Sequence, residues 1–302
     1  MARAAFIGLG NMGRPMAAAL ARAGIETRGF DLNATLIDSA APDGVVATGS
    51  LREAIDGADV VITMLQSGDQ TLAVWREIAA QARGKLLIDC STIDVESARA
   101  AHRLAQESGA LSVDAPVSGG VAGAKAATLT FMCGGEAEAF AAAQPILEHM
   151  GAHVLHCGGA GMGQAAKICN NLMLGVTMIA TAEAFVLAER LGLSHRALFD
   201  AASMSSGQSW SLTSYCPAPE LVPTSPANHD YRPGFMTALM LKDLRLAQEA
   251  AAHAGAAAPL GAAATQLYAL HQAAGQGDAD FSSIIRFIRG DRARPPGEDG
   301  QS

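Results

Sequence analysis

Short apolar runs alternate with longer amphipathic stretches over the first half of the sequence. Four of these runs are predicted to form strands, at residues 4–8, 26–31, 59–65 and 85–92. Strands that alternate with helical patterns in this way indicate βαβ units, and therefore a parallel sheet with helices on both faces. From residue 110 to residue 158 the strand signals continue with fewer helices between them, so we expect the sheet to extend there and to become mixed.

The strand signal stops after Gly163, and a long helix is predicted over Gln164–Leu191. Gly192 suits the end of this helix, and Ser194 can cap the next one. At 1.5 Å per residue the helix would be about 42 Å long. Its body, residues 172–188, is apolar nearly all round. This predicts a helix that is packed on every side, in part by a second subunit.

The segment Ser206–Phe235 is rich in Pro, Ser and Asn, and predicts an ordered but irregular excursion. Helices are predicted to resume at 236–255 and at 261–274. The charged Pro/Gly end of the chain is predicted to be disordered. The predicted organisation is an α/β domain over residues 1–162, an all-helical domain over 163–290 for substrate binding and oligomerisation, and a tail over 291–302.

Composition narrows the class of protein. At 302 residues the chain is about twice the usual length of a domain, in agreement with two domains. The net charge is −8 and the basic residues are scattered, so we expect no nucleic acid partner. Five cysteines without a C-x-x-C pair indicate free thiols in a reducing compartment, and we expect a cytoplasmic protein. Among them, Cys169 is expected to be a small core residue.

Membrane and metal partners are not expected. The longest apolar stretch, Leu172–Ala182, is about half of the roughly 20 residues that a membrane span needs. The apolar run at the N-terminus is too short for the core of a signal peptide. His149, His153 and His156 lie close together in the sequence but lack acidic or cysteine partners at ligand spacing. We therefore predict no metal site.

A glycine-rich loop follows the first predicted strand. Three of its residues fit the pattern G-x-G-x-x-G, and Asp31 ends the next predicted strand about 20 residues later. The first glycine permits a tight turn, the second lets a pyrophosphate approach the backbone, and the third lets helix and strand pack closely. This constellation predicts a Rossmann-type domain that binds a dinucleotide at a helix N-terminus. The loop residues expected to bind the cofactor are Gly8, Leu9, Gly10, Asn11, Met12 and Gly13.

Asp31 favours NAD over NADP as the cofactor. Its carboxylate would accept hydrogen bonds from both hydroxyls of the adenosine ribose and repel a 2′-phosphate, and Leu32 stands where an arginine would help NADP. Leu65 and Thr92 follow predicted strands at their carboxyl ends, where ligands lie in open α/β sheets. We expect Leu65 to pack on the cofactor and Thr92 to bond near the nicotinamide ribose, although plain loop roles fit both residues equally well.

Four separated stretches resemble the signature stretches of the β-hydroxyacid dehydrogenases in order and spacing. They are GLGNMGRPM at residues 8–16, DAPVSGGVAGA at 114–124, GAGMGQAAKICNN at 159–171 and KDLRLAQE at 242–249. The resemblance implies an α/β Rossmann-type N-terminal domain that binds NAD, followed by an all-α C-terminal domain that begins with the long helix. It also implies a homodimer or homotetramer built through that helical domain, and oxidation of a small 3-hydroxy acid.

Within that family, residues 206–235 and the stretch after them are similar to the branch that oxidises 3-hydroxyisobutyrate to methylmalonate semialdehyde in valine catabolism. Two other reactions share the motifs: reduction of tartronate semialdehyde (2-hydroxy-3-oxopropionate), and reduction of glyoxylate or succinic semialdehyde. Asp31 and the segment SPANHDY argue against both. A non-catalytic NAD-binding protein is the alternative from another class, and the candidate catalytic residues disfavour it.

Lys167 and Asn171 are four residues apart in the long helix, so they project from one face of it. Oxidation of an alcohol needs a group that accepts the hydroxyl proton while a hydride leaves the same carbon. A lysine can do this when burial and nearby positive charge lower the pKa of its amine. The resemblance assigns this role to Lys167, with Asn171 holding the lysine or the hydroxyl in place. From periodicity alone, a solvated Lys167 is equally compatible.

The second and fourth signature stretches supply candidate substrate ligands. After a predicted strand, the hydroxyl of Ser118 and the backbone N–H groups of Gly119 and Gly120 can form a nest for a carboxylate, although a plain turn is the alternative. The resemblance implies that all three bind the substrate carboxylate. It also places Lys242 near the substrate and the nicotinamide, and we expect Asp243 to position that lysine; a solvated pair is the alternative.

Overall fold

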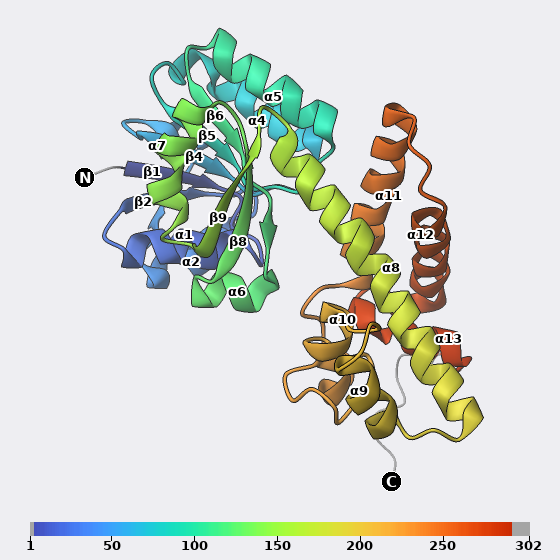
Figure 1. Cartoon of the computed structure of the whole chain (residues 1–302). Helices are drawn as coiled ribbons and strands as arrows, with labels where there is room; N and C mark the ends of the chain where they lie inside the picture. Colours follow the sequence, from blue (N-terminus) through green and yellow to red (C-terminus); the bar gives the residue numbers. More distant parts are fainter. Residues whose placement is uncertain (1–2, 292–302) are drawn as a thin grey trace. The chain divides into compact units, whose positions relative to one another are not determined.

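The structure is a computed structural model that describes residues 3–291. It divides into two compact units, and the division falls between Lys167 and Ile168, inside one long helix (Figure 1). An α/β unit is followed by a helical unit, so the predicted fold class is confirmed. The predicted tail at 291–302 lies, apart from Asp291, outside the described residues.

The first unit is built on a sheet that has nine strands within the described chain, in the order β3-β2-β1-β4-β5-β6-β8-β7 with β9 beside β8. Six of them form the parallel part: β3 Val46–Ala47, β2 Glu26–Phe30, β1 Arg3–Ile7, β4 Val60–Thr63, β5 Leu86–Asp89 and β6 Leu111–Asp114. Strand β8 (Leu129–Gly134) runs antiparallel to β6 and β7 (Val117–Ser118), and parallel to β9 (Gly151–Gly158). The sheet therefore becomes mixed after β6, as predicted.

Helices cover both faces of this sheet because successive residues of a strand point to opposite sides. On β1, Ala4 and Phe6 face one apolar core, whereas Ala5 and Ile7 face another. The first core is covered by α1 (Gly13–Arg22), α2 (Ala34–Ala40), α6 (Gly120–Ala126) and α7 (Ala137–Leu147). The second is covered by α3 (Leu51–Ile55), α4 (Gly68–Ile78) and α5 (Val95–Glu107). Two short 3₁₀ turns, η1 (Ala41–Asp43) and η2 (Ala79–Gln81), follow α2 and α4.

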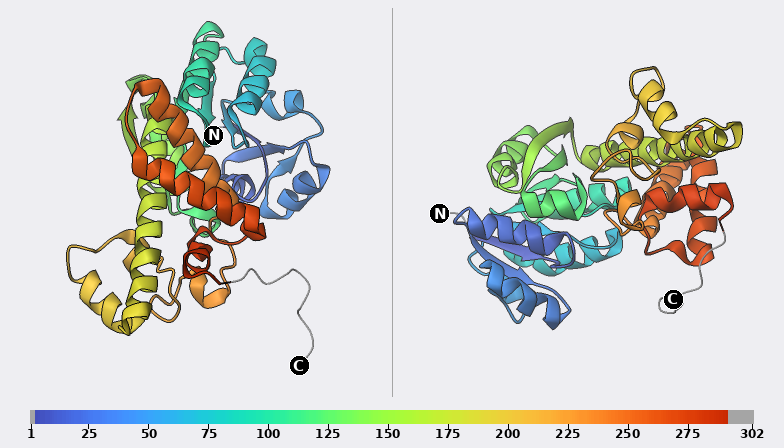
Figure 2. Two further views of the ribbon diagram at one scale, coloured as in Figure 1. Left: turned by 90° about the vertical axis from the view of Figure 1, so that its right-hand side faces the viewer. Right: turned by 90° about the horizontal axis from the view of Figure 1, so that it is seen from below.

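Every regular element in the described part of the second unit is helical. The longer helices are α8 (Met162–Leu191), α9 (His195–Ser203), α11 (Thr237–Ala254) and α12 (Pro259–His271), of which α11 and α12 lie side by side (Figure 2). The shorter ones are α10 (Trp210–Thr213), η3 (Pro226–His229), η4 (Gln272–Gln276), η5 (Phe281–Ser283) and α13 (Ile284–Arg289). Met178 and Phe185 of α8 pack with Met240 of α11 and Tyr268 of α12 in the core of this unit.

The long helix ends where the sequence predicts. It begins at Met162 and ends at Leu191, and Gly192 then adopts a left-handed φ of +79°. The Ser194 hydroxyl accepts a hydrogen bond of 3.2 Å from the backbone N–H of Ala197, which confirms it as the cap of α9.

A single chain covers only part of α8. Cys169, Met173, Ala180, Leu187 and Leu191 are exposed, and they follow one another at helical spacing along one stripe. Packing on every side would need the second subunit that the prediction includes, and this stays a prediction. The expectation that Cys169 is a core residue is wrong for the single chain.

The same helix is long and apolar enough to cross a membrane, by length and composition only. An 18-residue window has a mean hydropathy of 1.6, which the shorter stretch Leu172–Ala182 does not reveal. This is weak evidence for a span, because the core helix of a soluble protein passes the same test, and Met178, Ala182 and Phe185 of α8 are fully buried in the core of the second unit.

Candidate active site

The loop between β1 and α1 has the geometry that its three glycines predict. Gly8 has a φ of +95°, and a Cβ on it would lie 2.3 Å from the carbonyl oxygen of Met64. A Cβ on Gly13 would lie 1.9 Å from the carbonyl oxygen of Gly8, so helix and loop touch through bare backbone. Around Gly10, by contrast, no atom lies within 4 Å of an added Cβ. The open side of the loop is therefore at Gly10, where a pyrophosphate would approach.

No side chain caps α1, and the N–H of Arg14 in its first turn donates to the carbonyl oxygen of Gly10 at 3.1 Å. The N-terminus of the helix still directs the positive end of its dipole towards the loop, which favours an anion there. Leu9 contributes only backbone to the loop because its side chain is buried in the core. Asn11 is exposed and Met12 is half-buried, so the loop presents a polar surface beside an apolar one. These features fit a bound dinucleotide.

Asp31 ties the end of β2 to the glycine loop. One carboxylate oxygen accepts a hydrogen bond of 2.8 Å from the backbone N–H of Leu9, and the other accepts one of 2.9 Å from the N–H of Asn33. Each oxygen keeps a further lone pair for a ribose hydroxyl. Leu32 beside it is 95% exposed and carries no positive charge. The arrangement fits a ribose with two free hydroxyls.

The two predicted cofactor contacts at the ends of β4 and β5 lie on loops that are joined by hydrogen bonds. The backbone N–H of Leu65 donates to the Ser91 hydroxyl at 2.7 Å, and that hydroxyl donates to Asp89 at 2.6 Å. The Leu65 side chain also lies beside Gly8. Thr92 follows Ser91 and is half-buried. The structure thus brings Leu65 next to the dinucleotide loop. The Ser91 hydroxyl joins the start of the Thr92 loop to Leu65.

Asp89 is a buried carboxylate at the centre of this network. Its Oδ1 accepts hydrogen bonds from Thr63 at 2.7 Å and from Ser91, whereas its Oδ2 has no partner among the described residues. Burial raises the pKa of Asp89 from its usual 3.8 to about 6, although these hydrogen bonds oppose the shift. The sequence interpretation missed Asp89; the signal for it is a carboxylate that ends a buried apolar strand.

The Ser118 loop has a backbone that requires glycine. Ser118 ends β7 and is half-buried, and Gly119 and Gly120 follow with φ values of +128° and +60°. Side chains other than glycine rarely adopt such angles. The local geometry suits a close approach of a ligand to backbone N–H groups, and carboxylate binding at these three residues stays a prediction.

The second glycine-rich turn packs against its own chain. A Cβ on Gly163 would lie 2.3 Å from the carbonyl oxygen of Met132 and 2.6 Å from that of Asp114. Gly158 and Gly161 have φ values of +128° and +80°. At Gly163 and Gly161 the close neighbours are β8, Asp114 and Val95, whereas nothing lies within 4 Å of a Cβ on Gly159.

A buried polar stripe runs along the otherwise apolar start of α8. Gln164, Lys167 and Asn171 are 0%, 7% and 1% exposed, and their spacing of three and four residues places them on one side of the helix. Lys167 is therefore not the solvated lysine that periodicity alone allows. Within the second unit, the Asn171 amide donates to the Asp243 carboxylate at 2.5 Å.

Asp243 is buried, 4% exposed, on α11, and Lys242 beside it is half-buried. The pair is therefore not a solvated surface pair. Asn171 is one partner of Asp243, and the expectation that Asp243 positions Lys242 stays a prediction.

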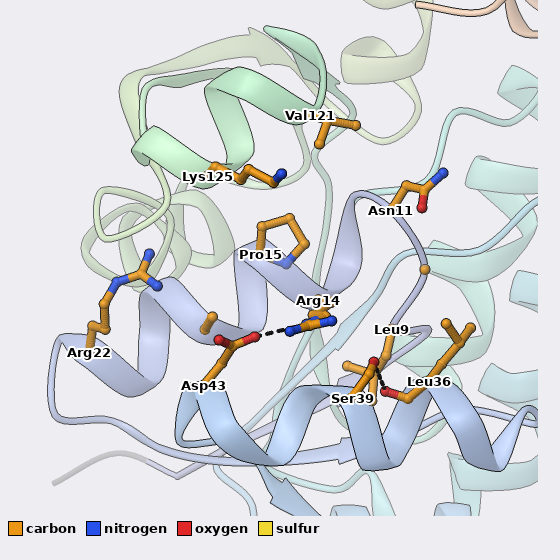
Figure 3. A pocket seen from close by; sticks show the side chains of 12 residues that line it. Leu9, Asn11, Arg14, Pro15, Arg22, Leu36, Ser39, Asp43, Val121 and Lys125 are labelled. Carbon is orange, nitrogen blue, oxygen red and sulfur yellow. Dashed lines mark hydrogen bonds and ion pairs between the residues drawn. The ribbon is translucent and has the colours of Figure 1, made fainter. Parts of the chain in front are cut away.

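A cavity of about 520 Å³ lies beside the dinucleotide loop in the first unit (Figure 3). Gly10 and Asn11 are among its lining residues, together with Arg14, Arg22 and Lys125. The charge of Arg14 is neutralised by an ion pair with Asp43, in which Nε of Arg14 lies 2.8 Å from Oδ2 of Asp43. Arg22 and Lys125 are exposed, so the cavity is an open surface groove with a modest positive charge. Within the described residues there is no group of three potential metal ligands.

Comparison with known proteins gives the family. The sequence model described as the NAD binding domain of 6-phosphogluconate dehydrogenase matches residues 3–159, and the one described as NAD-binding of NADP-dependent 3-hydroxyisobutyrate dehydrogenase matches residues 161–288. A "Probable 3-hydroxyisobutyrate dehydrogenase" of Mycobacterium tuberculosis is 52% identical over 290 residues, which cover 96% of this chain and 98% of that protein. The chain belongs to the 3-hydroxyisobutyrate dehydrogenase family. This confirms the predicted family, and with it the prediction that the protein is an NAD-dependent dehydrogenase.

Two further comparisons bear on the substrate. An "NAD-dependent L-serine dehydrogenase" of Pseudomonas aeruginosa is 46% identical over 292 residues, covering 95% of this chain and 98% of that protein. The solved structure of the 3-hydroxyisobutyrate dehydrogenase of Mycobacterium tuberculosis with L-serine is 52% identical, covers 96% of this chain and 99% of that one, and superposes with a TM-score of 0.93. Family membership thus leaves two substrates to be distinguished.

Proposed function

We propose that this protein oxidises 3-hydroxyisobutyrate to methylmalonate semialdehyde with NAD, in valine catabolism. The observation that carries the proposal is the buried Lys167, which lies in the third signature stretch of a chain 52% identical to a relative named for this activity. A buried lysine without a chemical task is unusual, because burial of its charge is costly.

In the proposed reaction the proton of the substrate hydroxyl passes to Nζ of Lys167. The carbon that carries this hydroxyl loses a hydride and becomes the carbonyl carbon of the product. NAD, when bound, supplies the acceptor for that hydride. Asn171 is held by Asp243, so its amide is fixed to orient the lysine or the substrate hydroxyl. Ser118, Gly119 and Gly120 would bind the substrate carboxylate, and Lys242 would add a positive charge beside it. In the reverse direction, Lys167 returns the proton to the carbonyl oxygen.

L-Serine is the second candidate substrate, because one relative is named for it and a solved relative was crystallised with it. Both compounds have a carboxylate, a central carbon and a terminal CH₂OH group. They differ at the central carbon, which carries a methyl group in 3-hydroxyisobutyrate and an ammonium group in L-serine. The discrimination therefore depends on whether the pocket around that carbon is apolar or anionic. A preference for 3-hydroxyisobutyrate means an apolar pocket, since burying an unpaired ammonium group is costly.

An initial-rate screen tests the proposal. The purified protein is assayed with 3-hydroxyisobutyrate, L-serine, 3-hydroxypropionate, glycerate and 4-hydroxybutyrate, each with NAD and with NADP. We expect the highest kcat/KM for 3-hydroxyisobutyrate with NAD. A higher kcat/KM for L-serine would replace the proposed substrate, and no turnover of any hydroxy acid would favour the non-catalytic alternative.

We also propose that the protein selects NAD over NADP through Asp31, because both oxygens of its carboxylate are held beside the glycine loop. Replacing Asp31→Ser together with Leu32→Arg removes the negative charge and supplies a partner for a 2′-phosphate. We expect the ratio of kcat/KM for NAD to that for NADP to fall at least about tenfold. Leu32→Arg alone is the matched control, and an unchanged ratio in the double variant would refute the role of Asp31.

A homodimer or homotetramer is the proposed assembly, since the apolar stripe on α8 needs a partner surface. Cytoplasmic localisation stays a prediction from the free thiols.

A further inference from the structure

The first turn of α8 is held by a side chain from another element. Asp114 ends β6 and is 2% exposed. Its Oδ1 accepts the backbone N–H of Gly161 and its Oδ2 that of Gln164, each at 2.9 Å. These are N–H groups that a helix leaves without internal partners, and a negative charge there also interacts favourably with the helix dipole. Asp114 therefore acts as a cap supplied from the sheet.

The glycines of the turn make room for this carboxylate. A Cβ on Gly163 would lie 2.8 Å from Asp114 Oδ2, and a Cβ on Gly134 of β8 would lie 2.4 Å from Asp114 Oδ1. Both positions must lack a side chain for the helix to start this close to the sheet. The glycine-rich turn thus serves to seat α8 on Asp114.

His102 and Ser112 complete the surroundings of the carboxylate. His102 Nε2 lies 2.8 Å from Asp114 Oδ1, and its Nδ1 lies 2.7 Å from the Ser112 hydroxyl. A carboxylate only accepts hydrogen bonds, so Nε2 carries the hydrogen. Asp114 is therefore held from the side of α5 as well as from α8, which fixes its rotamer.

Gln164 joins the same turn to the loop that follows β5. Its Nε2 donates to the carbonyl oxygen of Ser91 at 2.7 Å, and its Oε1 accepts the N–H of Ile93 at 3.1 Å. Because each end of the amide has a partner of the right kind, its orientation is unambiguous. The Ser91 hydroxyl in turn accepts the N–H of Leu65. The first turn of α8 is thus locked to the loops predicted to contact the cofactor.

We infer that Asp114 and Gln164 are positioning residues for Lys167, which follows Gln164 by one helical turn. With the first turn fixed at both Asp114 and the Ser91 loop, the helix can neither rotate nor slide there, and the direction of the lysine stem is set. A displacement of about 1 Å in a reacting group can reduce the rate about 10²-fold. The inference rests on the proposed function, because it gives these two residues a purpose only if Lys167 handles a proton.

The test uses Asp114→Asn and Gln164→Leu in the full chain. In the first variant an amide N–H group faces a backbone N–H group, and in the second both side-chain hydrogen bonds are lost at similar volume. We expect kcat to fall at least about tenfold in each, with a larger isotope effect for substrate deuterated at the reacting carbon. The Kd for NAD, measured by fluorescence, should change less than about twofold in Asp114→Asn, because the Gly8–Gly13 loop is untouched. For Gln164→Leu, kcat is measured at saturating NAD, because this variant also releases the loop that carries Thr92. Amide exchange across residues 159–167 should become faster.

Thr27→Val is the matched control. Like Asp114 and Gln164, Thr27 is a buried polar residue of the first unit, 1% exposed, but its hydroxyl donates to the nearby carbonyl oxygen of Ile25. It should change the melting temperature without changing kcat. Faster exchange at 159–167 with kcat within about twofold of wild type would overturn the inference, as would a fall in kcat that the isotope effect does not accompany.

A failure of the proposed function gives a different result. If the wild-type chain turns over no hydroxy acid, the positioning of Lys167 is measured by its rate of reaction with an amine reagent, followed by peptide mass spectrometry. That rate should rise at least about threefold in both variants and stay unchanged in Thr27→Val, and an unchanged rate in Asp114→Asn and Gln164→Leu would overturn the inference.

Discussion

At the scale of single residues, Lys167 is the side chain on which the proposed chemistry depends. Lys167→Ala removes the proton acceptor but leaves the glycine loop and Asp31 in place, so turnover should fall by about 10²-fold or more while NAD still binds. Steady-state kinetics and a fluorescence titration with NAD measure the two quantities. Arg83→Ala, which removes an exposed basic side chain before the start of β5, is the control and should keep wild-type turnover. Near-wild-type turnover of Lys167→Ala would refute the assigned role.

Asp89 gives a second residue-scale prediction, on stability against pH. Because burial raises its pKa from 3.8 to about 6, the folded state binds the proton more tightly than the unfolded chain does. Its stabilising contribution is fully present below pH 3.8 and is lost as pH rises through about 6, which amounts to about 3 kcal/mol. Asp89→Asn should remove that loss, so the variant should gain stability over wild type between pH 4.5 and 7.

The measurement uses the indole of Trp75, which donates to Thr63 beside Asp89 at 3.3 Å. Trp210 is the only other tryptophan of the chain, so a Trp210→Phe background makes urea unfolding of the first unit visible by itself. Asp59→Asn, an exposed carboxylate in the same unit, is the control. A difference between Asp89→Asn and its parent that does not grow with pH would contradict the prediction.

At the scale of elements, Asp280 explains how the excursion at 206–235 is ordered with little regular structure. Its Oδ2 accepts hydrogen bonds from the Tyr215 hydroxyl at 2.8 Å and from the N–H groups of Gly234 and Phe235 at 2.9 and 3.0 Å. Its Oδ1 accepts two more from Ser282. Five donors satisfy a carboxylate that is 0% exposed, and they tie Tyr215 and the end of the segment to η5.

Asp280→Asn should therefore destabilise the second unit by about 2–4 kcal/mol, because an amide N–H group then faces up to three donors. Trp210 stacks on Tyr215 and reports the unfolding of this unit in a Trp75→Phe background. Tyr215→Phe, which removes one of the five donors, is the control and should cost about 1 kcal/mol. Equal losses in the two variants would refute Asp280 as the centre that holds the segment.

Elements were predictable from the sequence where they depend on local periodicity and local caps. The strands β1, β2, β4 and β5 of the parallel sheet, the end of α8 at Gly192 and the Ser194 cap follow from neighbouring residues alone, whereas the two-residue strand β3 was not predicted. The anchors of the site were not predictable, because their partners are distant in the sequence: Asp114 and Gln164 are 50 positions apart, and Gln164 and Ser91 are 73 positions apart. The residue types in the sequence predict the glycine loop, but only the folded structure shows that Gly163 lies beside the carboxylate of Asp114.

At the scale of the whole molecule, the sequence alone also did not predict which side of α8 a single chain leaves exposed. Apolar composition all round α8 predicted burial all round, whereas a single chain supplies neighbours for only part of the helix surface. Met173, Leu187 and Leu191 are 62%, 58% and 74% exposed. We propose that this stripe of large side chains is an interaction surface, and a stable contact between protein chains buries about 1,200–2,000 Å². A second copy of the same chain fits, since α8 would then pair with itself about a two-fold axis.

The last prediction tests that assembly. Replacing Met173→Glu and Leu187→Glu places two negative charges per chain on the stripe, where a two-fold contact would bring them near their own copies and desolvate them. Size-exclusion chromatography with light scattering should give a dimer or tetramer for wild type and a monomer for the double variant. Leu155→Glu, at an exposed position of β9 that is 52% exposed, is the control and should keep the wild-type mass. If wild type is monomeric, or if the double variant keeps its mass, the stripe does not hold the subunits together, and α8 must be exposed for another reason.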